Sequence, residues 1–195
     1  FSFPVIGITG SNGKTIVKEW LYQLLHNDYS IARNPKSYNS QIGVPLSVWQ
    51  MNSQNTLGIF EAGISMPGEM ERLEKIIAPT IGIFTNIGEA HSEGFENSKQ
   101  KAAEKSLLFS NTPVVVYCKD DVLVDEAMQS LHAKNNKTLF TWGNNELSTL
   151  HIASIQVQPY NTVVKAGYQK RKISISIPFT NDAAVKNAIT CWCVL

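Results

Sequence analysis

A glycine-rich segment between two apolar runs constrains the fold more than any other part of this chain. Thr9-Gly10-Ser11-Asn12-Gly13-Lys14-Thr15 follows an apolar run at 5–8 and precedes an amphipathic stretch at 17–25. This order predicts a buried strand, a tight turn and the start of a helix. Glycines let the N–H groups of such a turn point inward, and the helix N-terminus adds partial positive charge. The segment therefore predicts a phosphate-binding loop.

The residues expected to contact a nucleotide are consecutive in this loop: Gly10, Ser11, Asn12, Gly13, Lys14 and Thr15. In nucleotide sites of this kind Lys14 meets the β- and γ-phosphates and Thr15 holds Mg²⁺. Ile8 stands where the longer Walker A pattern has glycine, so the match is to a shorter G-x-x-G-K-T variant. An ordinary strand-to-helix turn is the alternative, which Gly-Lys-Thr at a helix start disfavours.

The composition is that of an ordinary globular protein. The chain has 195 residues, of which 43% are apolar and 17% charged, so we expect one large domain with a substantial core. Seventeen basic and sixteen acidic residues leave a net charge of +1. The chain has no basic run of the kind that a nucleic-acid groove requires, so nucleic acids are not expected as partners.

The cysteines and the apolar runs of the sequence indicate the cellular compartment in which the protein is expected. Cys118, Cys191 and Cys193 lack the paired spacing of a metal site and lie in apolar surroundings, which favours reduced thiols. No segment has the pattern of a signal peptide or a membrane span. We therefore expect a cytoplasmic protein without a membrane partner. The last apolar stretch, 188–195, stops without a cap or turn, so we expect a piece of a longer protein.

Short apolar runs alternate with helical patterns. Buried strands are expected at 5–9, 57–60, 81–85 and 114–117, and helices near 13–26, 44–51, 67–77, 99–109 and 122–133. This alternation predicts a parallel sheet covered by helices on both faces. Pro45 and Pro67 fall where a first helical turn tolerates proline, and Ser65 is placed to cap the third helix.

The pattern changes after Trp142-Gly143. Apolar and polar residues alternate at 152–157, 163–164 and 173–177, with a turn around 167–171, which predicts antiparallel strands. A final helix is expected to begin near 181 or 182. The sequence thus predicts an α/β fold with a P-loop, a mostly parallel doubly wound sheet and an antiparallel extension in its C-terminal part.

Polar residues at two strand ends are candidates for chemistry. Glu61 follows the second predicted strand, and ligands of open α/β sheets bind beyond the carboxyl ends of strands, where a carboxylate can hold Mg²⁺. A Glu that caps a helix or faces solvent is the alternative. His91 follows the third predicted strand in a polar loop, so a metal role competes with a structural or solvated one. Lys105, with Lys99 and Lys101, is expected on a solvated helix face.

Five motifs occur in this chain in an order that resembles the central ATP-binding domain of the Mur ligases, and the resemblance covers essentially the whole chain. The motifs are Gly10-Ser11-Asn12-Gly13-Lys14-Thr15, Asn39-Ser40-Gln41-Ile42-Gly43-Val44-Pro45-Leu46, Glu61-Ala62-Gly63, Asn86 with Ala90-His91-Ser92-Glu93-Gly94-Phe95, and Lys105. Lys18-Glu19 and Gly68-Glu69 are most similar to the type that adds D-alanyl-D-alanine. Some members of that type are fused to an alanine racemase, a fusion that this chain is too short to show.

The resemblance implies the middle part of a three-domain enzyme, with a uridine-nucleotide domain before it and a closing domain after it. It implies ATP and Mg²⁺ as cofactors, and UDP-N-acetylmuramoyl-tripeptide and D-alanyl-D-alanine as substrates joined through an acyl phosphate. By matching positions, Thr15 and Glu61 hold a first Mg²⁺, and His91 and Lys105 a second. An ammonium cannot ligate a cation, so Lys105 has to be carbamoylated for this role.

The resemblance also has implications for three further positions. Asn39 is implied near the γ-phosphate, against the alternative of a loop residue that caps the following helix. Near the end of the chain, Asn187 alone matches the family's adenine-contacting segment. Trp142 matches an aromatic-glycine turn of the family, and a core tryptophan explains it equally well.

Other function classes remain to be weighed. Another Mur-type ligase or a folylpolyglutamate-type ligase is the nearest rival, and the residues after Lys14 disfavour the latter. A guanine-nucleotide switch is disfavoured because Asn136-Lys137 is followed by Thr138-Leu139, without the aspartate of a guanine-reading motif. A module that binds nucleotide without turnover is a third class, and it applies most directly to this domain alone.

Overall fold

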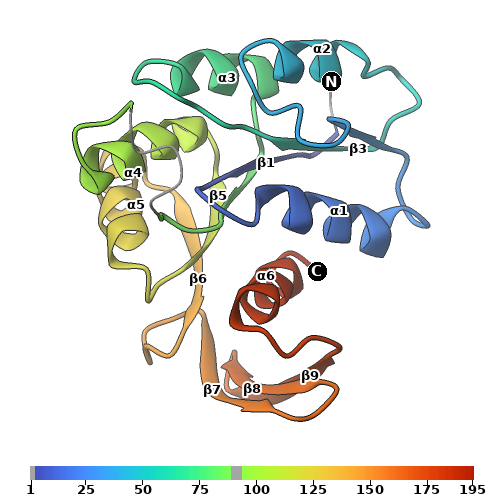
Figure 1. Ribbon diagram of the computed structural model, residues 1–195, viewed down its shortest axis with the longest axis vertical. Helices are drawn as coiled ribbons and strands as arrows, with labels where there is room; N and C mark the ends of the chain where they lie inside the picture. Colours follow the sequence, from blue (N-terminus) through green and yellow to red (C-terminus); the bar gives the residue numbers. More distant parts are fainter. Residues whose placement is uncertain (1–2, 89–93) are drawn as a thin grey trace.

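The computed structural model describes residues 3–88 and 94–195, and Figure 1 shows them as a long sheet flanked by helices. In the described residues the sheet has the strand order β2-β3-β1-β4-β5-β6-β7-β8-β9. The strands are β1 Val5–Thr9, β2 Ile31–Arg33, β3 Leu57–Glu61, β4 Ile81–Phe84, β5 Val114–Cys118, β6 Thr138–Gly143, β7 Leu150–Val157, β8 Thr162–Tyr168 and β9 Arg171–Ile177. The helices are α1 Lys14–Leu25, α2 Gly43–Trp49, α3 Met70–Ile77, α4 Ser98–Ser106 with the 3₁₀ turn η1 Leu107–Phe109, α5 Val122–Asn135 and α6 Asp182–Trp192.

The first six strands and the start of β7 pair in parallel, as the alternation of strands and helices predicts. β1 lies between β3 and β4, and the register pairs Ile8 with Glu61 on one side and Ile83 on the other. Every residue of β1 and β3 is buried, which is typical of parallel strands covered on both faces. The carboxyl ends of these strands therefore meet at one edge of the sheet.

Alternate side chains of the central strands enter two separate cores. Phe60 packs on the face covered by α2, α3 and α5, whereas Ile59 packs on the face covered by α1 and α6. Burying one such side chain stabilises the fold by about 2–3 kcal/mol. The prediction of a sheet covered on both faces is confirmed.

The predicted antiparallel extension is also confirmed. β7, β8 and β9 form a meander, with an irregularity in the β7–β8 register between Ile152 and Ser154. α6 packs against α1, as Figure 1 shows, and Asn187 of α6 lies against Gly13 of the glycine-rich loop. No helix in the described parts of the chain has the length and apolar character needed to cross a membrane.

Some local predictions are wrong. The third helix does not include Pro67, because Gly68 adopts φ +82° and α3 begins only at Met70. Ser65 is not its cap either, since the Glu69 carboxylate instead accepts from the N–H groups of Ser65 at 2.7 Å and Met66 at 3.1 Å. The prediction also lacked β2 and β6. β2 is a half-buried strand of 3 residues at the sheet edge, too short to show a period.

Candidate functional site

Two glycines shape the loop between β1 and α1. Gly10 has φ +141° and Gly13 has φ +83°, which L side chains rarely adopt. A Cβ on Gly10 would lie 2.0 Å from Thr85 Oγ1, and one on Gly13 would lie 2.5 Å from Asn187 Oδ1. Gly13 is the N-cap of α1, and no side chain of the described residues caps this helix. Its first-turn N–H groups are therefore available to an anion.

The segment after β4 holds this loop in shape. Thr85 Oγ1 donates to the carbonyl of Asn12 at 2.6 Å. The side-chain amide of Asn86 accepts from the N–H of Asn12 and donates to its carbonyl, both at 3.1 Å. Ser11 donates through its N–H to the Asn86 carbonyl at 2.8 Å and through its hydroxyl to the Gly88 carbonyl at 3.2 Å. The loop is thus pre-organised, which reduces the entropy lost when a ligand binds.

Lys14 curls back over the loop that precedes it. Its Nζ donates to the carbonyls of Gly10 at 2.9 Å and Ser11 at 3.0 Å. Burial lowers the pKa of Lys14, the Glu61 carboxylate opposes that shift, and the Lys101 ammonium adds to it. The Lys14 charge is therefore close enough to feel a carboxylate from β3 and an ammonium from α4.

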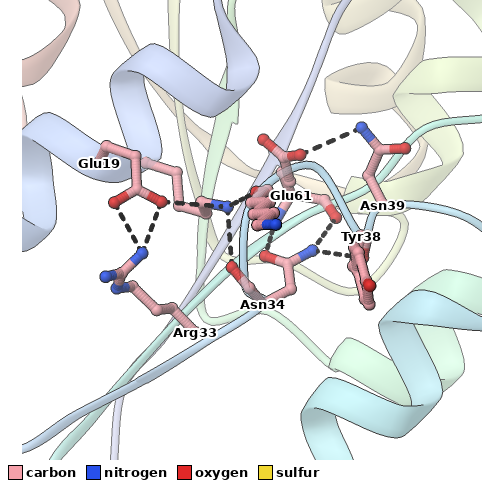
Figure 2. A network of polar contacts seen from close by, with 8 residues as sticks. Glu19, Arg33, Asn34, Tyr38, Asn39 and Glu61 are labelled. Atoms are coloured by element: carbon pink, nitrogen blue, oxygen red, sulfur yellow. Dashed lines mark hydrogen bonds and ion pairs between the residues drawn. The ribbon is translucent and has the colours of Figure 1, made fainter.

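Glu61 ends β3 and is fully buried, with 0% of its surface exposed. Oε1 accepts a hydrogen bond from Asn39 Nδ2 at 3.1 Å, as Figure 2 shows. The buried Oε2 has no hydrogen-bond partner among the described residues. The alternative of a solvent-facing Glu61 is therefore wrong.

An orphaned carboxylate oxygen fits a cation site. Mg²⁺ is commonly held by one or two carboxylates together with phosphate oxygens and waters. Thr15, half-buried in the first turn of α1, offers a hydroxyl beside Lys14. In residues 3–88 and 94–195 no group of three or more His, Cys, Asp and Glu side chains could hold a metal by itself. The orphaned oxygen of Glu61 therefore suits a Mg²⁺ that takes its other ligands from phosphate, water and a hydroxyl such as that of Thr15.

Asn39 contacts the Glu61 segment and not the helix that follows it. Its carbonyl accepts from the N–H of Gly63 at 2.8 Å, and a Cβ on Gly63 would lie 2.9 Å from Asn39 Oδ1. The N-cap of α2 is Ile42, which has no side-chain cap, while Ser40 Oγ accepts from the Gly43 N–H at 3.2 Å. The helix-capping alternative for Asn39 is therefore wrong.

The prediction of a solvated lysine face on α4 is correct only for Lys99. Lys101 is 0% exposed and Lys105 is 1% exposed, and Lys101 Nζ donates to the carbonyl of Gly88. Burial, with the nearby ammonium groups of Lys14 and Lys101, lowers the pKa of Lys105 to about 7. The neutral form of the Lys105 amine is thus favoured far more than that of an exposed lysine, although the sequence pattern alone did not single it out.

His91 lies outside the described residues, so its metal role stays a prediction. Two residues that follow it in the same motif are described. A Cβ on Gly94 would lie 1.8 Å from the carbonyl oxygen of Ser65, and Phe95 is buried in the core beneath α2 and α3. Gly94 and Phe95 therefore anchor the return of the chain from this loop to α4.

A cavity of about 680 Å³ opens beside the glycine-rich loop. It is lined by Gly13, by Trp142 of β6 and by Asn187 of α6, among others. Trp142 also belongs to the core on the α1 face, and its Nε1 is buried without a partner in the described part of the chain. The core alternative for Trp142 is therefore confirmed, and the residue also lines the cavity.

Other lining residues were missed by the sequence reasoning. Asp120 accepts from the N–H of Asn144 at 2.8 Å, and the carboxylate of Asp121 accepts from the N–H of Ile87 at 3.0 Å. Both acids follow β5, and the strand-end rule that selected Glu61 would have found them. Lys101 gave no such signal, because its burial depends on elements remote in the sequence.

Solved structures share this fold. MurF from Acinetobacter baumannii matches 98% of this chain and 42% of its own, with a TM-score of 0.86 and 22% identity. MurF ligase from Thermotoga maritima in complex with ADP matches 100% of this chain and 45% of its own, with a TM-score of 0.80 and 24% identity. Folylpolyglutamate synthase from Mycobacterium tuberculosis matches 98% of this chain and 54% of its own, with a TM-score of 0.73 and 15% identity. At these identities the likeness establishes the fold alone.

The model of the Mur ligase middle domain matches residues 8–195. The chain belongs to the Mur ligase family. Among relatives of this Mur ligase domain, the UDP-N-acetylmuramoyl-tripeptide–D-alanyl-D-alanine ligase of Borreliella burgdorferi is 44% identical over 105 residues, 54% of this chain and 23% of the relative. The enzyme of the same name from Rickettsia prowazekii is 30% identical over 185 residues, 89% of this chain and 39% of the relative. This Mur ligase domain thus spans well under half the length of these relatives.

Proposed function

We propose that residues 1–195 are the ATP-binding middle domain of a longer ligase that adds D-alanyl-D-alanine to UDP-N-acetylmuramoyl-tripeptide, a step of peptidoglycan precursor synthesis. The observation that carries the proposal is the buried Oε2 of Glu61, which has no partner in the described residues and belongs to a carboxylate within electrostatic reach of Lys14. A phosphate-binding lysine beside an orphaned carboxylate suits a nucleotide bound with Mg²⁺. The names of the relatives support the substrates.

In this proposal the triphosphate lies on the loop formed by Gly10, Ser11, Asn12, Gly13, Lys14 and Thr15. The N–H groups at the start of α1 meet phosphate oxygens, and Lys14 exchanges its carbonyl partners for the β- and γ-phosphates. The base enters the 680 Å³ cavity, where Asn187 lies against Gly13. The ADP bound to the Thermotoga maritima enzyme supports the choice of an adenine nucleotide.

The reaction begins with attack of a tripeptide carboxylate oxygen on the γ-phosphorus of ATP. The bond to ADP breaks and an acyl phosphate forms. The amine of D-alanyl-D-alanine then attacks the acyl carbon, loses a proton and expels phosphate, which leaves a peptide bond. The main obstacle is electrostatic, because an anionic carboxylate has to approach a polyanionic triphosphate. Lys14 offsets that repulsion, and Asn39 orients the reacting groups at the edge where it meets Glu61.

Thr15 and Glu61 would hold one Mg²⁺, and His91 and Lys105 a second, and these ions would supply further positive charge. The lowered pKa of Lys105 supports the second assignment, because only a neutral amine reacts with carbon dioxide. That reaction forms a nitrogen–carbon bond, releases one proton and gives a carbamate. The neutral amine is thereby converted into a group with anionic oxygens, which a cation can bind.

The remaining domains complete the site. A uridine-nucleotide domain before this one and a closing domain after it hold the two substrates, so the middle domain alone binds nucleotide without joining them. We place the enzyme in the cytoplasm, where ATP and reduced thiols are both found. All three cysteines are free in this fold, which agrees with a reducing compartment.

The test uses the full-length protein with ATP, Mg²⁺, UDP-N-acetylmuramoyl-tripeptide and D-alanyl-D-alanine, and measures both ADP release and product by mass spectrometry. We expect ligation that depends on D-alanyl-D-alanine, and we expect Lys14→Ala to abolish acyl phosphate formation. Equal activity with glutamate as the amine would favour a folylpolyglutamate-type ligase. Ligation by Lys14→Ala would show that the phosphate loop is misassigned.

A further inference from the structure

A buried lysine lies one helical turn after Lys14 on α1. Lys18 is 0% exposed, and its Nζ donates to the carbonyl of Asn34 at 2.8 Å and to the carbonyl of Lys36. The same atom lies 3.4 Å from Glu19 Oε1. An ammonium has three N–H donors, so these three acceptors satisfy it. Lys18 therefore does not bind phosphate, and its ammonium ties α1 to the segment after β2.

Asn34 continues this connection to β3. It is also 0% exposed, and its Oδ1 accepts from the N–H of Glu61 at 3.0 Å. Its Nδ2 donates to the carbonyls of Glu61 at 2.9 Å and Tyr38 at 2.8 Å, as Figure 2 shows. The side chain of Asn34 thus holds both main-chain polar groups of Glu61, and it also holds the turn that leads to Asn39.

We propose that Lys18 is a positioning residue, whose ammonium holds the 34–39 segment so that Asn39 meets Glu61 beside the phosphate-binding loop. This inference rests on the proposed function. The contacts run without a gap from Lys18 to Asn34, from Asn34 to Glu61, and from Glu61 to Asn39. Lys18 and Asn34 therefore hold α1, which starts with Lys14, in register with the Glu61 carboxylate. In the proposed function neither of these two side chains touches the phosphate or the cation.

An ion pair on the outer side supports the same arrangement. Arg33 of β2 donates to both carboxylate oxygens of Glu19, at 2.5 and 2.6 Å, and its guanidinium stacks 4.0 Å from the centre of the Tyr22 ring. Glu19 therefore carries a charge between two cations, Lys18 and Arg33. This fixes the start of the 34–39 segment from the solvent side.

The chain offers a matched control for a merely structural role. Lys137, between α5 and β6, is 5% exposed, and its Nζ donates to the carbonyls of Ser110 at 2.7 Å and Thr112 at 3.0 Å. Replacing either lysine with methionine keeps the aliphatic stem and leaves buried carbonyls without their donor. The two variants are expected to lose similar stability, but only Lys18 is connected to Glu61.

The experiment compares Lys18→Met and Lys137→Met in the full-length ligase. For Lys18→Met we expect kcat to fall about 100-fold while the KM for ATP changes less than about threefold, because misplacing a reacting group costs rate more than binding. We also expect a higher Mg²⁺ concentration at half-maximal rate, and faster hydrogen exchange at 34–41. For Lys137→Met we expect kcat within about twofold of the wild type.

Equal losses of kcat in the two variants would show that Lys18 only stabilises the fold and would overturn the inference. So would a raised KM for ATP with kcat intact. If Lys18→Met yields no folded enzyme, Asn34→Asp decides, because it removes the two amide donors and is expected to give the same fall in kcat. An inactive wild type that still binds ADP would instead refute the proposed ligase function.

Discussion

The pKa of Lys105 makes the stability of this chain depend on pH. Its side chain is 1% exposed, and burial with the charges of Lys14 and Lys101 lowers its pKa from 10.5 to about 7. In the unfolded chain the ordinary value applies. Between about pH 7 and about pH 10.5 the unfolded state therefore binds more protons than the folded state, and the free energy of unfolding rises with pH. Below about pH 7 the Lys105 ammonium is charged in both states, so the full cost of burying its charge lowers the free energy of unfolding.

The size of the effect follows from the two pKa values. Between about pH 6.5 and about pH 8.5 the linkage relation gives a gain of about 2 kcal/mol in the free energy of unfolding from Lys105. Lys105→Met keeps the aliphatic stem and has no proton to lose. The wild-type chain should therefore gain about 2 kcal/mol relative to Lys105→Met across this interval.

The measurement is urea unfolding of both chains, followed by circular dichroism, in buffers freed of carbon dioxide so that no carbamate forms. Titrating groups remote from Lys105 are common to the two chains and cancel in the comparison. Parallel stability profiles, with a change in their difference below about 0.5 kcal/mol, would refute the reasoning. Lys105 would then stay charged near neutral pH, and its assignment as an amine that reacts with carbon dioxide would lose its support.

Three further predictions concern the site and the chain. Gly10→Ala places a Cβ 2.0 Å from Thr85 Oγ1 at φ +141°, so we expect the free energy of unfolding to fall by about 3 kcal/mol. We also expect this variant to lose ADP binding, measured by calorimetry, and an unchanged affinity would show that binding does not need this loop shape. Glu61→Gln keeps an acceptor for Asn39 but removes the charge, so the enhancement of ADP binding by Mg²⁺ should fall at least about tenfold, and an undiminished enhancement would place the cation elsewhere. The chain of 195 residues alone should bind ATP weakly and form no peptide bond, and ligation at the rate of a full-length relative would contradict the three-domain proposal.

Strong local patterns account for the predictions that are confirmed. The strands around Ile8 and Ile59 are continuous apolar runs, which parallel strands buried on both faces require. The position of Glu61 follows from its place at the end of such a run. The prediction lacked β6 although its Thr-Leu-Phe-Thr-Trp composition favours a strand, because Trp142-Gly143 was interpreted as a turn and a change of pattern.

The glycine-rich loop, the parallel sheet and the sheet edge that carries Glu61 could all be predicted from local patterns, because glycine conformations and apolar periods act over a few neighbouring residues. The burial of Lys18, Lys101 and Lys105 became visible only in the folded chain. A lysine on a helix has the same local pattern whether water or another element faces it. Its burial is set by groups of other elements, such as the Asn34 carbonyl for Lys18 and the Gly88 carbonyl for Lys101, and no local pattern around the lysine encodes their approach.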